Sequence, residues 1–192
     1  MLERDNVLKD KLNKNYNGIY FEELLHVPKI NLQGQSNDKE FLKQINTTLN
    51  ISLPLEPNIY SINNLIKVIW LSPDEWLVQI LNKNKFKEIF TNLQSSLNPK
   101  NTAVTDLTEN RTILRMGGKN LYTLLAKFMV IDLNKALNKE FAVFQSLFVK
   151  VPVLVVRNHK NNEETNLDMF TNRSHANYMT NLLIDGTKNL DF

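Results

Sequence analysis

Residues able to do acid–base or metal chemistry are few in this sequence, and they lie far apart. The three histidines, His26, His159 and His175, are too widely separated to indicate a metal site by spacing. The chain has no cysteine, which excludes disulfide bonds, thiolate zinc sites, iron–sulfur clusters and cysteine nucleophiles. We therefore expect no catalytic residue, no metal site and no cofactor in this chain.

A glycine pair, Gly117 and Gly118, stands between a predicted strand and a predicted helix. Amides at a helix N-terminus can face a phosphate in such a position. The pair lacks the spaced glycines of a dinucleotide site and the lysine of a P-loop, and the chain has only five glycines. We interpret the pair as a structural turn.

Charged residues near this pair favour a structural ion pair. Arg111 and Arg115 are four residues apart in a predicted strand, so they point to the same face. Asp106 lies across a short loop and can pair with Arg111.

Two tryptophans flank a tight turn at residues 72–75, in which Pro73 fixes the backbone. We expect Trp76 to be buried and to hold this turn. A second interpretation is that Asp74 or Glu75 meets a partner at the rigid corner.

The composition indicates an ordinary globular protein. The 192 residues are 42% hydrophobic and 22% charged, which excludes a disordered chain and a collagen-like fibre. The net charge of +3 is spread over interspersed lysines and glutamates, so we expect no nucleic-acid partner. The N-terminus is charged, and the most apolar stretch, residues 149–156, is far shorter than the roughly 20 residues of a membrane span. We expect a cytoplasmic protein without a membrane partner.

The hydrophobic pattern predicts an α+β fold with two ferredoxin-like halves, each an antiparallel sheet with packed helices. In the first half, about 28–108, the predicted order is β-α-β-β-α-β. Its strands are expected at residues 29–33, 65–71, 76–81 and 103–107, and its helices after a cap at Ser36 or Asn37 and at 83–97. The second half, about 109–192, is predicted as β-α-β-β-β-α. Its strands are expected at residues 111–116, 141–150, 151–158 and 166–171, and its helices at 119–128 and 174–188. Residues 1–27 are predicted to be an N-terminal arm, with one or two helical turns in 19–26.

Two segments are more apolar than their context requires. Residues 53–58 (LPLEPN) cannot be helical, because two prolines restrict them. The stretch from Phe141 to Phe148 carries five large apolar residues, and a core role is favoured over an interface because both faces of a covered strand are apolar.

Several motifs, in order along most of the chain, resemble the gamma subunit of heterotetrameric sarcosine oxidase. The motifs are residues 31–34 (NLQG), 53–58 (LPLEPN), 70–77 (WLSPDEWL), 104–112 (VTDLTENRT), 124–127 (LLAK), 151–154 (VPVL) and 173–178 (RSHANY). The sequence departs from the family pattern at Ser72 and Lys119 and at His175, which puts local turn geometry in doubt.

The resemblance implies a fold related to the folate-binding domain of glycine-cleavage T proteins, which are aminomethyltransferases. It implies a non-catalytic subunit of an enzyme that demethylates sarcosine to glycine and transfers the one-carbon unit to tetrahydrofolate. It also implies alpha, beta and delta partner subunits, which hold the FAD, FMN, NAD, tetrahydrofolate and zinc. The residues we expect at the interface with these partners are Leu53, Leu55, Asn58, Asp74, Glu75, Arg111 and Arg173.

Three alternatives remain at this point. The first is the corresponding subunit of an N-methylglutamate dehydrogenase. The second is a free-standing folate-binding or aminomethyltransferase-like protein, against which residues 140–145 (EFAVFQ) lack the cysteine of the KGCYxGQ-type motif. The third, an RNA-binding protein, lacks the aromatic motif that such a sheet needs.

Overall fold

The computed structural model describes residues 15–188, which fall into two compact units. The continuous unit is His26–Glu109, and the split unit joins the segment before His26 to the chain from Asn110 onward. The chain passes from the continuous unit to the split unit after Glu109. The expected α+β class is confirmed, because each unit is an antiparallel sheet with packed helices.

The continuous unit is a ferredoxin-like fold with one additional edge strand. Its sheet has the order β4-β5-β6-β3-β7, with all neighbours antiparallel. Without β4, the order is that of a β-α-β-β-α-β unit. Its elements are β3 (Lys29–Gln33), α1 (Lys39–Leu49), β4 (Tyr60–Ile62), β5 (Ile66–Ser72), β6 (Glu75–Ile80), the 3₁₀ turn η1 (Lys83–Lys85), α2 (Phe86–Ser96) and β7 (Ala103–Asp106).

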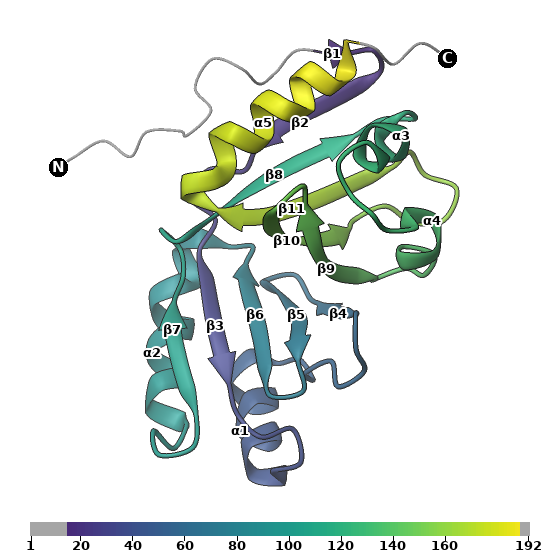
Figure 1. The fold of residues 1–192 in the computed structure, drawn as a ribbon. Coiled ribbons are helices and arrows are strands. Elements are labelled where there is room, and N and C mark those ends of the chain that lie inside the picture. Colours follow the sequence, from purple (N-terminus) through teal and green to yellow (C-terminus); the bar gives the residue numbers. More distant parts are fainter. Residues whose placement is uncertain (1–14, 189–192) are drawn as a thin grey trace, which may run out of the picture. The chain divides into compact units, whose positions relative to one another are not determined.

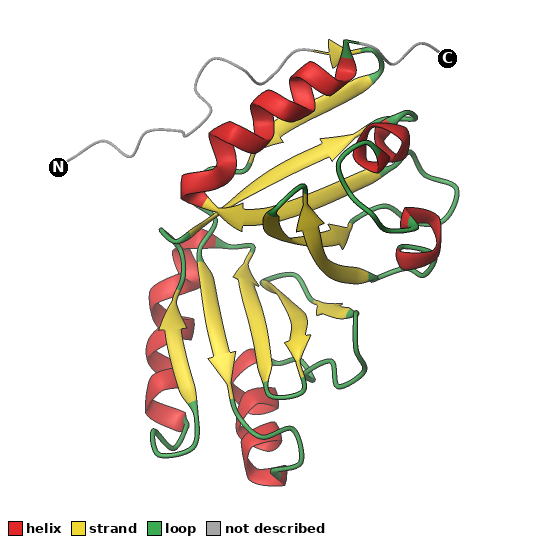
Figure 2. Cartoon of the chain, in the orientation of Figure 1, coloured by secondary structure: helices red, strands yellow, loops and turns green. Residues whose placement is uncertain are grey.

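Helices α1 and α2 pack side by side on one face of this sheet (Figure 2). The spacing of Phe41, Ile45 and Leu49 puts all three on one face of α1, where they are buried. Helix α1 begins at an Asp38 cap, whose carboxylate accepts the backbone N–H groups of Glu40 and Phe41 at 2.9 and 3.2 Å. The expected cap at Ser36 or Asn37 is therefore wrong by one or two residues.

The indole of Trp76 ties the proline segment to the β5–β6 hairpin. Trp76 is completely buried, as expected. Its Nε1–H donates to the carbonyl oxygen of Pro54 at 2.8 Å, and its ring lies 5.9 Å from that of Phe41. Trp76 thus gives residues 53–58, which have no regular secondary structure to position them, a fixed place on the unit.

The split unit is built on a six-stranded antiparallel sheet of order β1-β2-β8-β11-β10-β9 (Figure 1). Its core lies between one face of the sheet and helices α3, α4 and α5. The elements are β1 (Asn15–Tyr16), β2 (Ile19–Glu23), β8 (Arg111–Gly117), α3 (Leu121–Ala126), α4 (Leu133–Ala136), β9 (Val143–Phe148), β10 (Val151–Arg157), β11 (Asn166–Asn172) and α5 (Arg173–Thr187).

Strand β2 completes the sheet of the split unit from a distant part of the sequence. In β8-α3-β10-β11-α5 the ferredoxin-like order stops one strand short, and the missing position beside the first strand is filled by β2. The register pairs Tyr20 with Gly117 and Glu22 with Arg115.

The expected helical turns in residues 19–26 are wrong. Burial alternates along β2, with Ile19 and Phe21 buried and Tyr20 exposed, which is the period of a strand. Residues 15–23 consequently belong to the sheet and are not a loose arm, while the rest of the predicted arm up to residue 14 lies outside the described residues. Three short elements, β1, β4 and α4, were not expected from the sequence.

The glycine pair at the end of β8, Gly117 within the strand and Gly118 after it, allows β2 to approach closely. A Cβ atom on Gly117 would lie 2.3–2.5 Å from the Tyr20 ring and hydroxyl, and one on Gly118 would lie 2.0 Å from the backbone oxygen of Gly18. Gly118 also has φ 123°, which side chains rarely adopt. These contacts agree with the interpretation of the pair as a structural turn.

We predict that Gly118→Ala destabilises the protein far more than Gly18→Ala. The first substitution combines an unfavourable φ with a backbone clash, and we expect it to cost about 3 kcal/mol or more. Gly18 has φ 76° but open space around its Cβ position, so only the backbone term of about 1–2 kcal/mol applies. Urea unfolding of both variants measures the difference, and equal losses would show that the close β2 approach is not needed.

Candidate functional site

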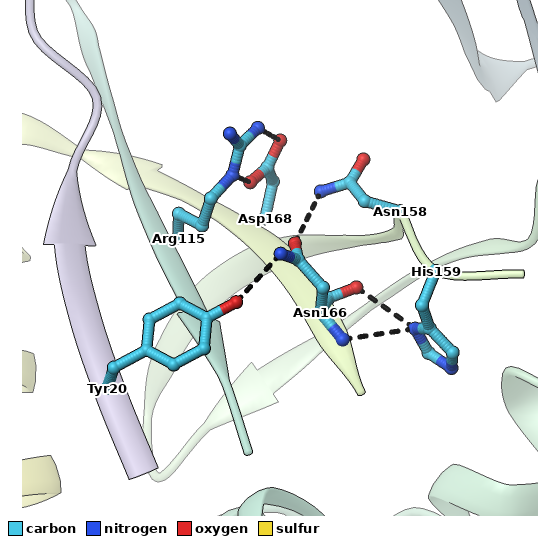
Figure 3. Close-up of polar contacts among 6 residues, drawn as sticks. All are labelled: Tyr20, Arg115, Asn158, His159, Asn166 and Asp168. Atoms are coloured by element: carbon cyan, nitrogen blue, oxygen red, sulfur yellow. Dashed lines mark hydrogen bonds and ion pairs between the residues drawn. The ribbon is translucent and has the colours of Figure 1, made fainter. Parts of the chain in front are cut away.

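The most polar part of the split unit is a network that joins strands β2, β8 and β11 to the loop after β10 (Figure 3). At its centre Arg115 and Asp168 form a two-point ion pair. Arg115 Nε donates to Asp168 Oδ1 at 2.8 Å, and its Nη2 donates to Oδ2 at 3.0 Å. The Asp168 side chain is fully buried, whereas the Arg115 side chain is 33% exposed.

The strand register produces this pair. Asp168 lies directly opposite Arg115 in the β8–β11 ladder, and Glu22 lies opposite Arg115 on its other side. The hydrogen bonds that the Arg115 guanidinium donates to Asp168 hold its pKa above its ordinary value. The buried carboxylate therefore has a permanently charged partner.

Asn166 is the hub of the second part of the network. Its Nδ2 donates to the Tyr20 hydroxyl at 2.8 Å, and its Oδ1 accepts from Asn158 Nδ2 at 3.4 Å. Its backbone N–H lies 3.2 Å from Nδ1 of His159. The hub thereby connects β2, at one side of the sheet, to the loop between β10 and β11.

Burial lowers the pKa of the His159 imidazole, and the nearby guanidinium of Arg157 acts in the same direction. The neutral ring is thus favoured. Its Nδ1 lies 3.2 Å from the Asn166 backbone N and 3.1 Å from the Asn166 backbone oxygen, and the tautomer decides whether it accepts from the first or donates to the second. This arrangement fixes the ring to the loop.

Arg157, which the sequence analysis did not single out, clamps the loop region from within. It is buried, and its guanidinium donates to the backbone oxygens of Leu137 at 2.7 Å and His159 at 3.0 Å and to Asn161 Oδ1 at 2.8 Å. An arginine at the end of an otherwise apolar strand, residues 151–157, was the available sequence signal.

The polar groups of this network form hydrogen bonds and an ion pair within the chain. Arg115, Asp168, His159 and Asn166 each bind another group of the chain, through distances typical of hydrogen bonds. Within residues 15–188 there is no cluster of three or more potential metal ligands. None of the described helices has the length and hydrophobicity of a membrane span.

The proline segment separates two residues that we expected to act together at an interface. Leu53 is only 7% exposed and belongs to the core of the continuous unit, whereas Leu55 is 50% exposed. Asn58 is exposed and has a left-handed backbone with φ 63°. Leu55 and Asn58 are thus accessible, while Leu53 is not.

The carboxylates of the tight turn make contacts within the unit. Asp74, which is exposed, accepts from the Ser72 hydroxyl at 2.6 Å, and its backbone oxygen accepts the N–H of Gly34 at 3.0 Å. Glu75 is half-buried and accepts from Asn31 Nδ2 at 2.5 Å.

The two arginines of the predicted interface meet at one end of the split-unit sheet. Arg111 pairs with Asn172 in the ladder, and the backbone N–H of Arg173 donates to the oxygen of Asn110 at 3.0 Å. Both arginines are half-buried. A cavity of about 160 Å³ beside them is lined by Arg111, Gln145, Ser146, Leu154, Phe170 and Asn172, among others.

Comparison with known proteins gives one family and a consistent fold. The model of the family described as "Sarcosine oxidase, gamma subunit family" matches residues 33–189. No curated protein matches the sequence significantly.

Two solved structures have the same fold. The structure of heterotetrameric sarcosine oxidase from Corynebacterium sp. U-96, in complex with pyrrole 2-carboxylate, contains a chain that superposes with a TM-score of 0.78 at 18% identity, over 95% of this chain and 89% of that one. Glycine cleavage system aminomethyltransferase T from Bartonella henselae superposes with a TM-score of 0.62 at 16% identity, over 93% of this chain and 48% of that one.

We predict an asymmetric response when the ion pair of the polar network is broken. Arg115→Met leaves the fully buried Asp168 carboxylate without its partner, and we expect a loss of about 3–5 kcal/mol. Asp168→Asn leaves a guanidinium that still reaches water, so the loss should be about 1–3 kcal/mol. Replacing both, as Arg115→Met with Asp168→Leu, should restore stability relative to Arg115→Met alone. Urea unfolding gives all three values; a double variant as unstable as the first single variant would contradict this account.

Proposed function

The chain belongs to the sarcosine oxidase gamma subunit family, and we propose that it serves that enzyme as a structural subunit without a reaction centre of its own. The enzyme is an oxidoreductase complex, and the fold of this chain is present in a solved heterotetrameric sarcosine oxidase. The partners we propose are the alpha, beta and delta subunits of the complex, in the cytoplasm.

The observation that carries the proposal is the use of the chemically capable groups to hold the fold. Gly117 and Gly118, the candidate phosphate turn, lie against Tyr20 and Gly18. Arg115 is occupied by Asp168, and His159 by the backbone of Asn166. These groups contact one another within the chain. This supports a role in which the chain acts by binding its partners through its surface.

The reaction that we propose for the complex is the one that the family resemblance implies. Sarcosine is demethylated to glycine, and the one-carbon unit passes to tetrahydrofolate. FAD, FMN, NAD, tetrahydrofolate and zinc are proposed to bind the partner subunits. The family match favours this subunit role over a free-standing folate-binding protein, whose kinship rests on the fold of the aminomethyltransferase T alone.

Co-expression of the chain with the other three subunits from the same source tests the proposal. We expect co-elution from a size-exclusion column at micromolar concentration in physiological salt, because permanent subunit interfaces are large, often above about 2,000 Å². The chain purified alone should lack flavin absorbance and should produce no peroxide from sarcosine.

Each half of the proposal has its own contrary result. Persistent elution apart from the partners would refute the subunit role. Stoichiometric flavin or sarcosine oxidation by the isolated chain would refute the non-catalytic role.

A further inference from the structure

Strand β9 forms one edge of the split-unit sheet and lacks two features that often protect an edge, charge and proline. It is the last strand in the sheet order, and no other strand of the described residues pairs with its outer side. Its sequence, VFQSLF, contains no charge and no proline. Natural edge strands are usually short, charged or interrupted by proline, because an open edge pairs with other chains.

The other edges among the described residues follow that rule. Strand β1 has two residues and β4 has three. Strand β7 has four and ends in Asp106. With its six residues, β9 is longer than any of these edges and, unlike β7, carries no charge.

The hairpin register shows which backbone groups of β9 face outward. Ala142 and Arg157 are joined by a backbone hydrogen bond of 3.0 Å, from the Arg157 N–H to the Ala142 oxygen. Hydrogen-bonded and non-hydrogen-bonded pairs alternate along an antiparallel ladder. Five residues on, the Leu147–Pro152 pair is therefore of the second kind, so the N–H and C=O of Leu147 point away from β10. Pro152, which has no N–H, fits such a position.

The residues at and just after the end of β9 include two exposed aliphatic side chains. Leu147 is 52% exposed and Val149 is 42% exposed. Val149 donates its N–H to the backbone oxygen of Phe128 at 2.8 Å, and the Phe128 and Phe148 rings stack at 4.9 Å. Val130, two residues after Phe128, is completely exposed. We call Leu147, Val149 and the outer side of β9 the β9 edge surface.

The backbone conformation of Val149 also supports an interface at this edge. Val149 has φ 57°, in the left-handed region that is a genuine outlier for a β-branched residue. It stands at the first position of a two-residue turn, where glycine is the usual choice for this conformation. An apolar side chain that is exposed and held in a strained backbone indicates a contact beyond those of the isolated chain.

We infer that β9 accepts an extended segment of a partner subunit as a further strand of this sheet. The inference rests on the proposed function, since the partner is another chain of the oxidase complex. An extended segment has free backbone groups that can pair with the outward N–H and C=O of Leu147. A helix cannot pair in this way, because its backbone groups are already bonded to one another. The segment should carry apolar, uncharged side chains where it faces Leu147 and Val149. A single added strand is small beside the area of a permanent interface, so it would form one part of a larger contact.

Hydrogen–deuterium exchange on the wild-type chain, free and in the purified complex, tests strand addition directly. We expect the amide of Leu147 to exchange at least about tenfold more slowly in the complex. Equal exchange in the two states would overturn the inference. If the wild-type chain does not assemble at all, the proposed function and the inference fail together, whereas assembly with an unprotected β9 overturns the inference alone.

Substitutions separate backbone pairing from side-chain packing. Leu147→Pro removes the outward N–H and keeps the bonds to β10, and we expect it to weaken assembly more than tenfold. Leu147→Ala keeps the N–H and should weaken assembly less. Ile62→Ala, on edge strand β4 of the continuous unit and 44% exposed in the native chain, is the matched control and should assemble as the wild type does.

The melting temperature of each variant shows whether it folds, and if Leu147→Pro does not fold, the wild-type exchange experiment still decides. Wild-type assembly by a folded Leu147→Pro variant would overturn the inference. A homodimer of the free chain that Leu147→Pro abolishes would overturn it in favour of a second copy as the occupant.

Discussion

The pairing of β2 with β8 is the interaction on which the split unit depends. From Asn110 onward the chain provides all but one of the positions of a ferredoxin-like sheet, and its last described element is helix α5. The N-terminal segment fills the remaining position, next to β8. The ladder can form at this spacing because Gly117 and Gly118 have no side chains. The Tyr20 ring occupies the volume beside Gly117, and the Gly18 backbone occupies the volume beside Gly118. A glycine pair that resembles a ligand turn in the sequence is thus explained by strand packing.

The polar network follows from the same pairing. Once β2 is in place, Tyr20 reaches Asn166, and Glu22 comes opposite Arg115, which already faces Asp168. A buried carboxylate is tolerated only with a charged and hydrogen-bonded partner, and the β8–β11 register supplies one. The polar and charged residues that could take part in chemistry consequently join parts of the chain that are far apart in sequence. In the role we propose, the subunit acts through the surfaces that this frame presents, and the edge of β9 is the surface we infer to bind a partner.

The sequence predicts the local features well, because they depend on neighbouring residues. Alternation in residues 29–33 gives the bounds of β3, the spacing of Phe41, Ile45 and Leu49 gives the buried face of α1, and the hairpin at Pro73 leads to the burial of Trp76. The features it misses depend on distant residues. Ile19–Glu23 looks like a helical turn until β8 is present to pair with it, and Asp168 has no visible partner until the register places Arg115 opposite. The predicted interface residues Leu53 and Leu55 look equivalent in sequence. In the structure Trp76 donates to the oxygen of Pro54 between them, and Leu53 lies in the core whereas Leu55 is exposed.

The central claim is that this chain supports an oxidase by its structure and takes no part in the chemistry. Sarcosine turnover per assembled complex measures this most directly, using a chain that carries His159→Asn together with Arg115→Met and Asp168→Leu. Complexes of full subunit content should turn over within about twofold of the wild-type rate, even where their yield falls. A loss of about 100-fold or more in fully assembled complexes, the size expected when a general acid or base is removed, would contradict the claim.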